Sequence, residues 1–321
     1  MFVDILLAIV GAALVIIGAD KLTDGSVALA RRFHIPELVI GLTIVAFGTS
    51  LPEFIVSLMA SIHHSSALSI GNIVGSNLFN TLMIVGCSAM VCPIVVSKST
   101  VSKDIPLTVL ASIVFPALAM DAFFSQSSGG DVLSRGDGIV LLGFFAIFMA
   151  YTFSLTKGDK VTPTNEAVAG PSMPVWQIAL YLVLGLAGLV IGGKLFVNGA
   201  SGIARSLGVS EAVIGLTLVA GGTSLPELAT SVIAARKGQS AMAIGNVVGS
   251  NLFNVFWILG CCSCITPLPV VGIAWTDFAL LLFSSLLFWI FARTSLRVVR
   301  WEGFLLVACY VAYISYLISQ V

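Results

Sequence analysis

The hexapeptide Gly-Thr-Ser-Leu-Pro-Glu at residues 48–53 recurs unchanged at residues 222–227. Each copy places one carboxylate, that of Glu53 or Glu227, within a strongly apolar segment. An ionisable group at membrane depth is energetically expensive and marks a functional site by default. Two such groups at matching positions of two halves predict one shared cation site.

The composition predicts a chain that lies in a lipid bilayer. Of its 321 residues, 58% are hydrophobic and only 9% are charged, and the mean hydropathy is +1.08. Soluble domains carry roughly 25% charged residues. The formal net charge is zero, which gives no electrostatic case for a nucleic-acid partner. Asp4 and the lack of a basic start indicate a retained first span rather than a cleaved signal peptide.

Ten apolar stretches have about the length, roughly 20 residues, that a helix needs to cross a bilayer. A membrane β-barrel needs alternating apolar and polar positions, whereas these stretches are continuously apolar, so we expect an all-α integral membrane protein. The expected spans are 2–19, 37–61, 68–92, 105–124, 138–156, 175–195, 211–235, 241–266, 274–292 and 301–319.

The two halves of the chain repeat each other. Residues 17–86 match residues 191–260 without a gap, at a constant offset of 174, and half of the pairs are identical. Because each half has five spans, an odd number, the second half must enter the membrane from the opposite side. We therefore predict two inverted five-helix repeats, at 1–156 and 175–321, joined by a polar linker at 157–174, with broken helices at the midplane.

The lysines and arginines predict the orientation. The loops after spans 1, 3, 5, 7 and 9 hold twelve of them, and the opposite face holds three. Cytoplasmic loops carry the excess of positive charge. The linker is therefore expected in the cytoplasm and both termini outside, in the plasma (inner) membrane.

Each hexapeptide concentrates oxygen ligands. Proline interrupts helical hydrogen bonding, so Pro52 and Pro226 are expected to free the carbonyls of Gly48 and Gly222. Ca²⁺ takes 6–8 oxygens, more than one peptide can easily supply, whereas two related by inversion can supply them; Na⁺ also takes hard oxygen ligands. Helical spacing places on matching faces Ala46, Thr49, Ser50, Glu53 and Ser57, and Ala220, Thr223, Ser224, Glu227 and Ser231.

A second repeated motif occupies residues 71–80 and 245–254. Its glycines have the small-xxx-small spacing that lets helices approach closely. Its polar residues fall at i, i+4 and i+8 on one face, so their oxygens can complete an ion site, or they can hydrogen-bond between packed helices. They are Asn72, Ser76 and Asn80, and Asn246, Ser250 and Asn254.

Other functional classes find less support in the sequence. A cation channel would need a filter-like ring motif, and broken helices in an inverted repeat favour a carrier. The three histidines lie outside the paired motifs, which disfavours an intramembrane hydrolase. The phosphate-binding loop of a pump is absent from the sequence, and the six cysteines lack zinc-site spacing. We therefore expect no enzyme activity and no cofactor.

The paired motifs in inverted halves closely resemble the cation/Ca²⁺ exchanger superfamily, and in particular its prokaryotic sodium/calcium exchanger-like branch. The resemblance covers essentially the whole chain. It implies antiport of Ca²⁺ against Na⁺ by alternating access, with the first and sixth spans sliding against the core. Carried over by motif position, it implies that the ions are bound by Glu53 and Glu227, with Thr49, Ser50, Thr223 and Ser224, the carbonyls of Ala46 and Ala220, and the flanking Ser76, Asn80, Ser250 and Asn254.

The chain departs from part of that superfamily at one position. Some members, including potassium-dependent exchangers, carry aspartate where this chain has Asn254, and here both Asn80 and Asn254 are neutral. This weakens a case for K⁺ transport and leaves two carboxylates, which one Ca²⁺ or two Na⁺ neutralise equally. The superfamily also includes proton-coupled exchangers, and burial favours a protonated carboxyl group. An H⁺/Ca²⁺ antiporter is therefore the alternative.

Overall fold

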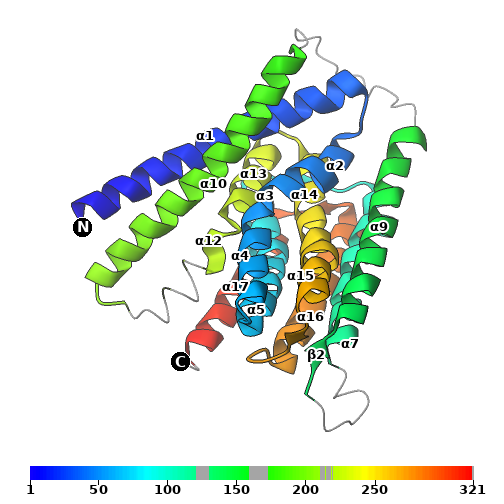
Figure 1. Ribbon diagram of the computed structural model, residues 1–321. Coiled ribbons are helices and arrows are strands. Elements are labelled where there is room, and N and C mark those ends of the chain that lie inside the picture. Colours follow the sequence, from blue (N-terminus) through cyan, green and yellow to red (C-terminus); the bar gives the residue numbers. More distant parts are fainter. Residues whose placement is uncertain (121–129, 159–172, 210–213, 215–217, 219, 320–321) are drawn as a thin grey trace.

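The computed structural model describes residues 1–120, 130–158, 173–209, 214, 218 and 220–319, and these are overwhelmingly helical (Figure 1). Among them, eight helices are long and apolar enough to cross a membrane. The all-helical class expected from the continuous apolar stretches is therefore confirmed. The eight are α1 (Phe2–Phe33), Ser66–Val91, Thr100–Ala119, α9 (Arg135–Gly158), α10 (Val175–Ser206), Ser240–Ile265, α16 (Trp275–Ser295) and α17 (Arg300–Ser319).

A broken helix adds a ninth candidate span within the described residues. It consists of α2 (Glu37–Ile40), η1 (Gly41–Val45), α3 (Ala46–Thr49) and α4 (Leu51–Ile62), and it bends by 48° between α3 and α4. The expected tenth span, 211–235, lies partly outside the described residues. Its described part includes α12 (Ala220–Gly222) and α13 (Leu225–Arg236).

The two spans that carry the second motif form the centre of the core. Each is 78% buried over its most apolar window, against 17–44% for the other six. Both contain a π-helical segment, a rare conformation that is frequent at functional sites. The first consists of α5 (Ser66–Leu78), η2 (Phe79–Ile84) and α6 (Val85–Val91), and the second of α14 (Ser240–Leu252), η5 (Phe253–Leu259) and α15 (Gly260–Ile265).

Helices α1 and α10 lie side by side, apart from most of the bundle (Figure 1). A Cβ atom on Gly11 would lie 2.7 Å from the Gly192 oxygen, and one on Gly18 would lie 2.8 Å from the Gly185 oxygen. Contact partners therefore run in opposite directions along the two helices. Only glycine allows backbones to approach this closely.

Both of these helices are longer than the sequence predicted. The expected first span ended at residue 19 and the sixth at 195, but α1 continues to Phe33 and α10 to Ser206. Asp20 and Asp24 follow the expected end of the first span and lie within α1. Their carboxylates lie 2.7 Å and 2.6 Å from the Lys237 Nζ atom.

Two short antiparallel strand pairs join the halves of the chain. β1 (Ile94–Val95) pairs with β4 (Arg297–Val298), and β2 (Val132–Leu133) pairs with β3 (Leu268–Pro269). In each pair, one strand follows the third span of one half and the other precedes the last span of the other half. Between β1 and α9 lies the span of η3 (Thr100–Asp104) and α7 (Ile105–Ala119).

Candidate ion-binding site

The structure brings the two hexapeptides together. Ser50 Oγ donates a hydrogen bond to Glu227 Oε1 at 3.1 Å, and Ser224 Oγ donates one to Glu53 Oε1 at 2.7 Å. Both glutamates are buried, with 1% of each exposed. Each carboxylate is therefore held by a hydroxyl from the other half of the chain, 171 or 177 residues away in sequence.

A helix break places each glutamate in the first turn of a helix. Ser50 (φ −82°, ψ 5°) precedes α4, and Ser224 (φ −92°, ψ 8°) precedes α13. The proline of each hexapeptide occupies the first turn of the new helix, where its missing N–H is tolerated. The partial positive charge of a helix N-terminus favours a nearby carboxylate. The broken geometry thus supports negative charge in an otherwise apolar bundle.

Two asparagines of the second motif hold the glutamate-bearing helices in place. Asn72 Nδ2 donates to Ser57 Oγ at 2.9 Å and to the Glu53 carbonyl at 3.3 Å. Asn246 Nδ2 makes the matching bonds to Ser231 Oγ at 2.9 Å and to the Glu227 carbonyl at 3.4 Å. Of the two roles open for these asparagines, helix-to-helix hydrogen bonding is the one that the structure supports.

A second asparagine network crosses between the halves. Asn80 Nδ2 donates to Asn251 Oδ1 at 3.1 Å, and Asn254 Nδ2 donates to Asn77 Oδ1 at 2.9 Å. These bonds use the nitrogens of Asn80 and Asn254 and leave their amide oxygens available. The network therefore fixes which end of each amide can face a cation.

Five buried oxygens of the predicted ligand residues have no hydrogen-bond partner. A buried polar group without a partner costs about 1–3 kcal/mol, and a bound ion is one way to satisfy it. All five atoms are acceptors or hydroxyls of the hard-oxygen type that Ca²⁺ and Na⁺ prefer. They are Glu53 Oε2, Glu227 Oε2, Asn80 Oδ1, Asn254 Oδ1 and Ser250 Oγ.

Among the described residues, no lysine, arginine or histidine forms a salt bridge with Glu53 or Glu227. The same residues also contain no group of three or more histidine, cysteine, aspartate or glutamate side chains that could hold a metal. Buried charges in proteins are paired or coordinate metals. The donor set here, two carboxylates with neutral oxygens, suits a hard cation.

The other predicted ligands are placed less uniformly. Thr49 Oγ1 lies 3.0 Å from the Val45 carbonyl and 3.2 Å from Asn246 Oδ1. The Ala46 carbonyl already accepts the Ser50 backbone N–H at 3.0 Å, and Ser76 Oγ lies 3.2 Å from Ser224 Oγ.

In the second half, Thr223 is a hydrogen-bond neighbour of Glu53. Ala220 belongs to α12, but its side-chain surroundings fall outside the described residues. Thr49 is the matching hydrogen-bond neighbour of Glu227, so the two threonines are placed alike.

Sequence reasoning missed one member of the site. Thr81 Oγ1 accepts a hydrogen bond from Asn251 Nδ2 at 2.9 Å. The position that corresponds to Thr81 at the offset of 174 is Val255, so the Asn77 nitrogen turns instead to the Asn251 carbonyl at 3.3 Å. Thr81 is present in only one half, so the duplicated motifs give no sign of it.

The family comparisons agree with this geometry. The family model described as "Sodium/calcium exchanger protein" matches residues 3–154 and 177–319. The sodium/calcium exchanger MaX1 of Methanosarcina acetivorans is 33% identical over 97% of both chains. The inner membrane protein YrbG of Escherichia coli is 35% identical over 97% of this chain and 95% of its own.

A solved structure matches the fold closely. It is that of the sodium-calcium exchanger NCX_Mj soaked with 2.5 mM Na⁺ and 0.1 mM Ca²⁺. It is 37% identical in sequence, covers 97% of both chains and superposes with a TM-score of 0.82. The resemblance inferred from the paired motifs is confirmed, and the chain belongs to the sodium/calcium exchanger protein family.

Proposed function

We propose that this chain is a secondary antiporter that exchanges Ca²⁺ for Na⁺ across the membrane by alternating access. The observation that carries the proposal is the crossed pair of serine–glutamate hydrogen bonds, beside which one oxygen of each glutamate has no partner. The pairing makes one site from two halves of the chain. The names of MaX1 and NCX_Mj, both sodium/calcium exchangers, support the same ions as substrates.

Charge balance explains how one site can exchange the two ions. Two ionised glutamates carry a charge of −2, which one Ca²⁺ or two Na⁺ neutralise equally. Binding of one Ca²⁺ or of two Na⁺ makes the buried site electrically neutral. An empty site leaves two uncompensated carboxylates, and this free-energy cost opposes the change between the inward-facing and outward-facing states. Competition between the ions for the same oxygens is then sufficient to couple their movements in opposite directions.

The proposed ligand set has a charged centre and neutral flanks. Glu53 and Glu227 form the centre, and the unpartnered oxygens of Asn80, Asn254 and Ser250 support their roles as flanking ligands. Ca²⁺ needs 6–8 oxygens, so the five unpartnered side-chain oxygens require completion. The family resemblance supplies candidates for it: Ser50, Ser224, Ser76, Thr49 and Thr223, with the carbonyls of Ala46 and Ala220.

We infer ten membrane spans in two inverted repeats, at 1–156 and 175–321. The inversion is supported by the opposite directions of α1 and α10 and by the matched exchange of strands between halves. The lysine and arginine bias supports a cytoplasmic linker at 157–174, most of which lies outside the described residues, with both termini outside. The name of the E. coli relative supports the inner membrane as the location.

Alternating access requires a part that moves against the site. Helices α1 and α10 pack closely against each other through Gly11, Gly18, Gly185 and Gly192, which holds the two helices together as one body. We propose that this pair slides as a unit across the two hexapeptides, exposing the site first to one side of the membrane and then to the other.

The experiment that tests this function is ⁴⁵Ca²⁺ uptake into sealed proteoliposomes that contain the full chain. We expect uptake when an outward Na⁺ gradient is imposed at equal pH on both sides. Uptake driven by a pH gradient alone, with no response to Na⁺, would replace the proposal with H⁺/Ca²⁺ antiport. Uptake that runs passively down the Ca²⁺ gradient without either counter-ion would indicate a channel.

A further inference from the structure

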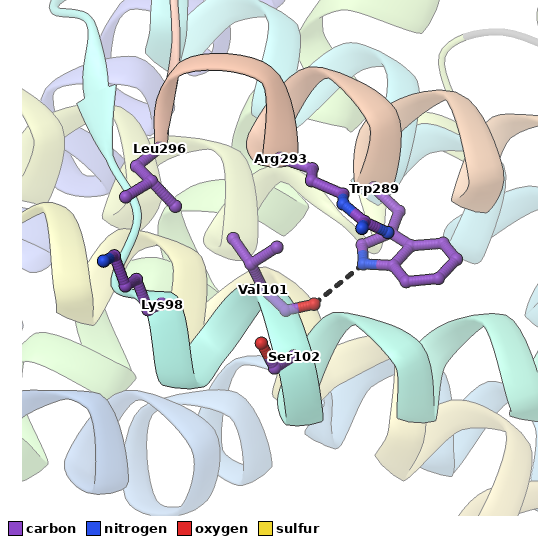
Figure 2. Close-up of a pocket in the computed structure, with 6 residues that line it drawn as sticks. All are labelled: Lys98, Val101, Ser102, Trp289, Arg293 and Leu296. Carbon is purple, nitrogen blue, oxygen red and sulfur yellow. Dashed lines mark hydrogen bonds between the residues drawn. The ribbon is translucent and has the colours of Figure 1, made fainter.

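A pocket at one end of the bundle has two basic walls. It lies between the start of the span Thr100–Ala119 and the last turns of α16, and Figure 2 shows Lys98 and Arg293 on opposite sides of it. Its volume of about 420 Å³ falls within the range of small-molecule sites, about 300–1,000 Å³. The six lining residues are Lys98, Val101, Ser102, Trp289, Arg293 and Leu296.

The two cations have no acidic partner among the described residues. The acids nearest in sequence, Asp104 and Glu302, form no salt bridge with either cation. Asp104 accepts the Tyr151 hydroxyl at 2.8 Å, and Glu302 accepts the Val299 backbone N–H at 2.9 Å. The pocket therefore presents uncompensated positive charge, and its occupant should be an anion.

Trp289 forms one wall of the pocket and is held in place by a hydrogen bond. Its indole N–H donates to the Val101 carbonyl at 2.7 Å, which ties α16 to η3 (Figure 2). The Arg293 guanidinium lies 6.0 Å from the Trp289 ring centre, within cation–π reach. Tryptophans concentrate at the membrane–water interface. Because α16 is 21 residues long, about the thickness of a bilayer, its last turns lie at that interface.

The remaining wall is apolar. Val101 is buried, and Leu296 ends α16 in the left-handed conformation (φ 52°, ψ 30°) that is common at helix C-termini. A small soluble anion would gain nothing from contact with this apolar wall, whereas the glycerol and first acyl carbons of a lipid would pack against it.

We propose that this pocket binds the phosphate of an anionic phospholipid, with Lys98, Arg293 and the Ser102 hydroxyl on the phosphate and Val101 and Leu296 against the lipid's apolar part. Basic pockets between membrane helices on the cytoplasmic side are the kind of site that holds anionic head groups. The bound lipid bridges η3 and α16. The proposal does not depend on which ions the chain exchanges.

Native mass spectrometry of the detergent-purified full chain tests it, with dioleoyl phosphatidylglycerol and dioleoyl phosphatidylcholine titrated separately. We expect tighter binding of phosphatidylglycerol, and the double variant Lys98→Ala/Arg293→Ala should weaken that binding by about tenfold or more, since each basic residue contributes a factor of several. Binding of phosphatidylcholine should stay unchanged. The matched control is Arg31→Ala/Arg32→Ala, which removes two charges from the end of α1 and should have little effect.

Two outcomes would overturn the proposal. One is unchanged phosphatidylglycerol binding in the double variant. The other is displacement of the lipid from wild type by inorganic phosphate at equal concentration, which would identify a site for a free anion. Should the double variant fail to fold, Lys98→Ala alone changes an exposed side chain, and it should still weaken phosphatidylglycerol binding severalfold.

Discussion

The two halves of the ion site hold their glutamates in the same way but surround them differently. Ser50 and Ser224 make reciprocal bonds to the carboxylates, and Asn72 and Asn246 make matching bonds to the helices that carry them. Further out, the match fails, because Thr81 has Val255 as its counterpart. The comparison teaches that the halves match at the carboxylates and at the asparagines around them, and that they differ at single hydroxyl positions farther from the charge.

The hydroxyls flanking the carboxylates illustrate the same contrast. Ser76 Oγ lies within hydrogen-bonding distance of Ser224 Oγ, whereas its counterpart Ser250 has no partner. Two flanking positions of unequal chemistry can differ in their affinity for Na⁺ while the central position stays common to both halves. In the proposed exchange cycle, the two halves can therefore share the central charge and still bind the ions in a preferred order.

The largest effect should come from removing either central charge. Glu53→Gln and Glu227→Gln should each reduce Na⁺-driven ⁴⁵Ca²⁺ uptake to the level of protein-free vesicles, because a charge of −1 cannot neutralise Ca²⁺. The matched control is Glu302→Gln, a buried glutamate whose role is to accept the Val299 N–H; it should retain exchange. If one glutamate variant kept full exchange, the two halves would not share the site.

A moderate loss of stability, equal in the two halves, should follow from removing the asparagine that hydrogen-bonds to the helix carrying Glu53 or Glu227. Asn72→Ala and Asn246→Ala each delete hydrogen bonds to a serine and to a glutamate carbonyl. Each should lower the free energy of unfolding by about 1–3 kcal/mol, measured by thermal unfolding in detergent. A large loss in one half and none in the other would break the symmetry argued for the core.

An unequal effect is expected at Thr81. Thr81→Val leaves the Asn251 nitrogen without its partner and should cost about 1–2 kcal/mol of unfolding free energy. Val255→Thr, the reverse exchange in the other half, should restore nothing of comparable size. Equal changes in the free energy of unfolding for the two substitutions would mean that the difference between Thr81 and Val255 does not affect stability.

The smallest effect concerns the ion pairs between α1 and the end of α13. Lys237 contacts Asp20 and Asp24, but the side chains are 30–42% exposed, so Lys237→Met should change unfolding free energy by less than about 1 kcal/mol. The corresponding position in the first half is His63, and His63→Met should change it still less. A loss of several kcal/mol in the Lys237 variant would contradict this ranking.

The same pairs should be insensitive to pH near neutrality. Burial lowers the pKa of Lys237, but its hydrogen bonds to Asp20 and Asp24 outweigh burial and raise the pKa above the ordinary value of 10.5. The stabilisation is therefore complete below pH 10.5 and is lost only as the pH rises through the higher folded pKa. The difference between wild type and Lys237→Met should be the same at pH 7 and pH 8.

Much of the core could be predicted because its polar motifs occur in both halves of the sequence. The hexapeptides, their hydroxyls and the neutral asparagines were all found as duplicated residues, and the structure brings most of them together. What occurs once was missed: Thr81 has no duplicate, and Asp20 and Asp24 of α1 pair with Lys237, more than 200 residues away in the sequence. Such distant partners leave no local pattern to read.

The π-helical turns also escaped prediction. Helical spacing places Ser76 and Asn80 on one continuous face, but the helix changes to a π-turn at Phe79 in the first half and at Phe253 in the second. A π-turn fits one extra residue into the helix, and apolar periodicity gives no local sign of it. The result is that Asn80 and Asn254 turn their nitrogens toward the partner asparagines in a way that spacing alone does not specify.

The central claim is that the two glutamates form one site, and equilibrium binding of ⁴⁵Ca²⁺ to the purified full chain tests it most directly. We predict one Ca²⁺ bound per wild-type chain, and the loss of that Ca²⁺ in Glu53→Gln alone and in Glu227→Gln alone. Two Ca²⁺ bound per wild-type chain, with one retained at unchanged affinity in each single variant, would contradict the claim and show that each half binds its own ion.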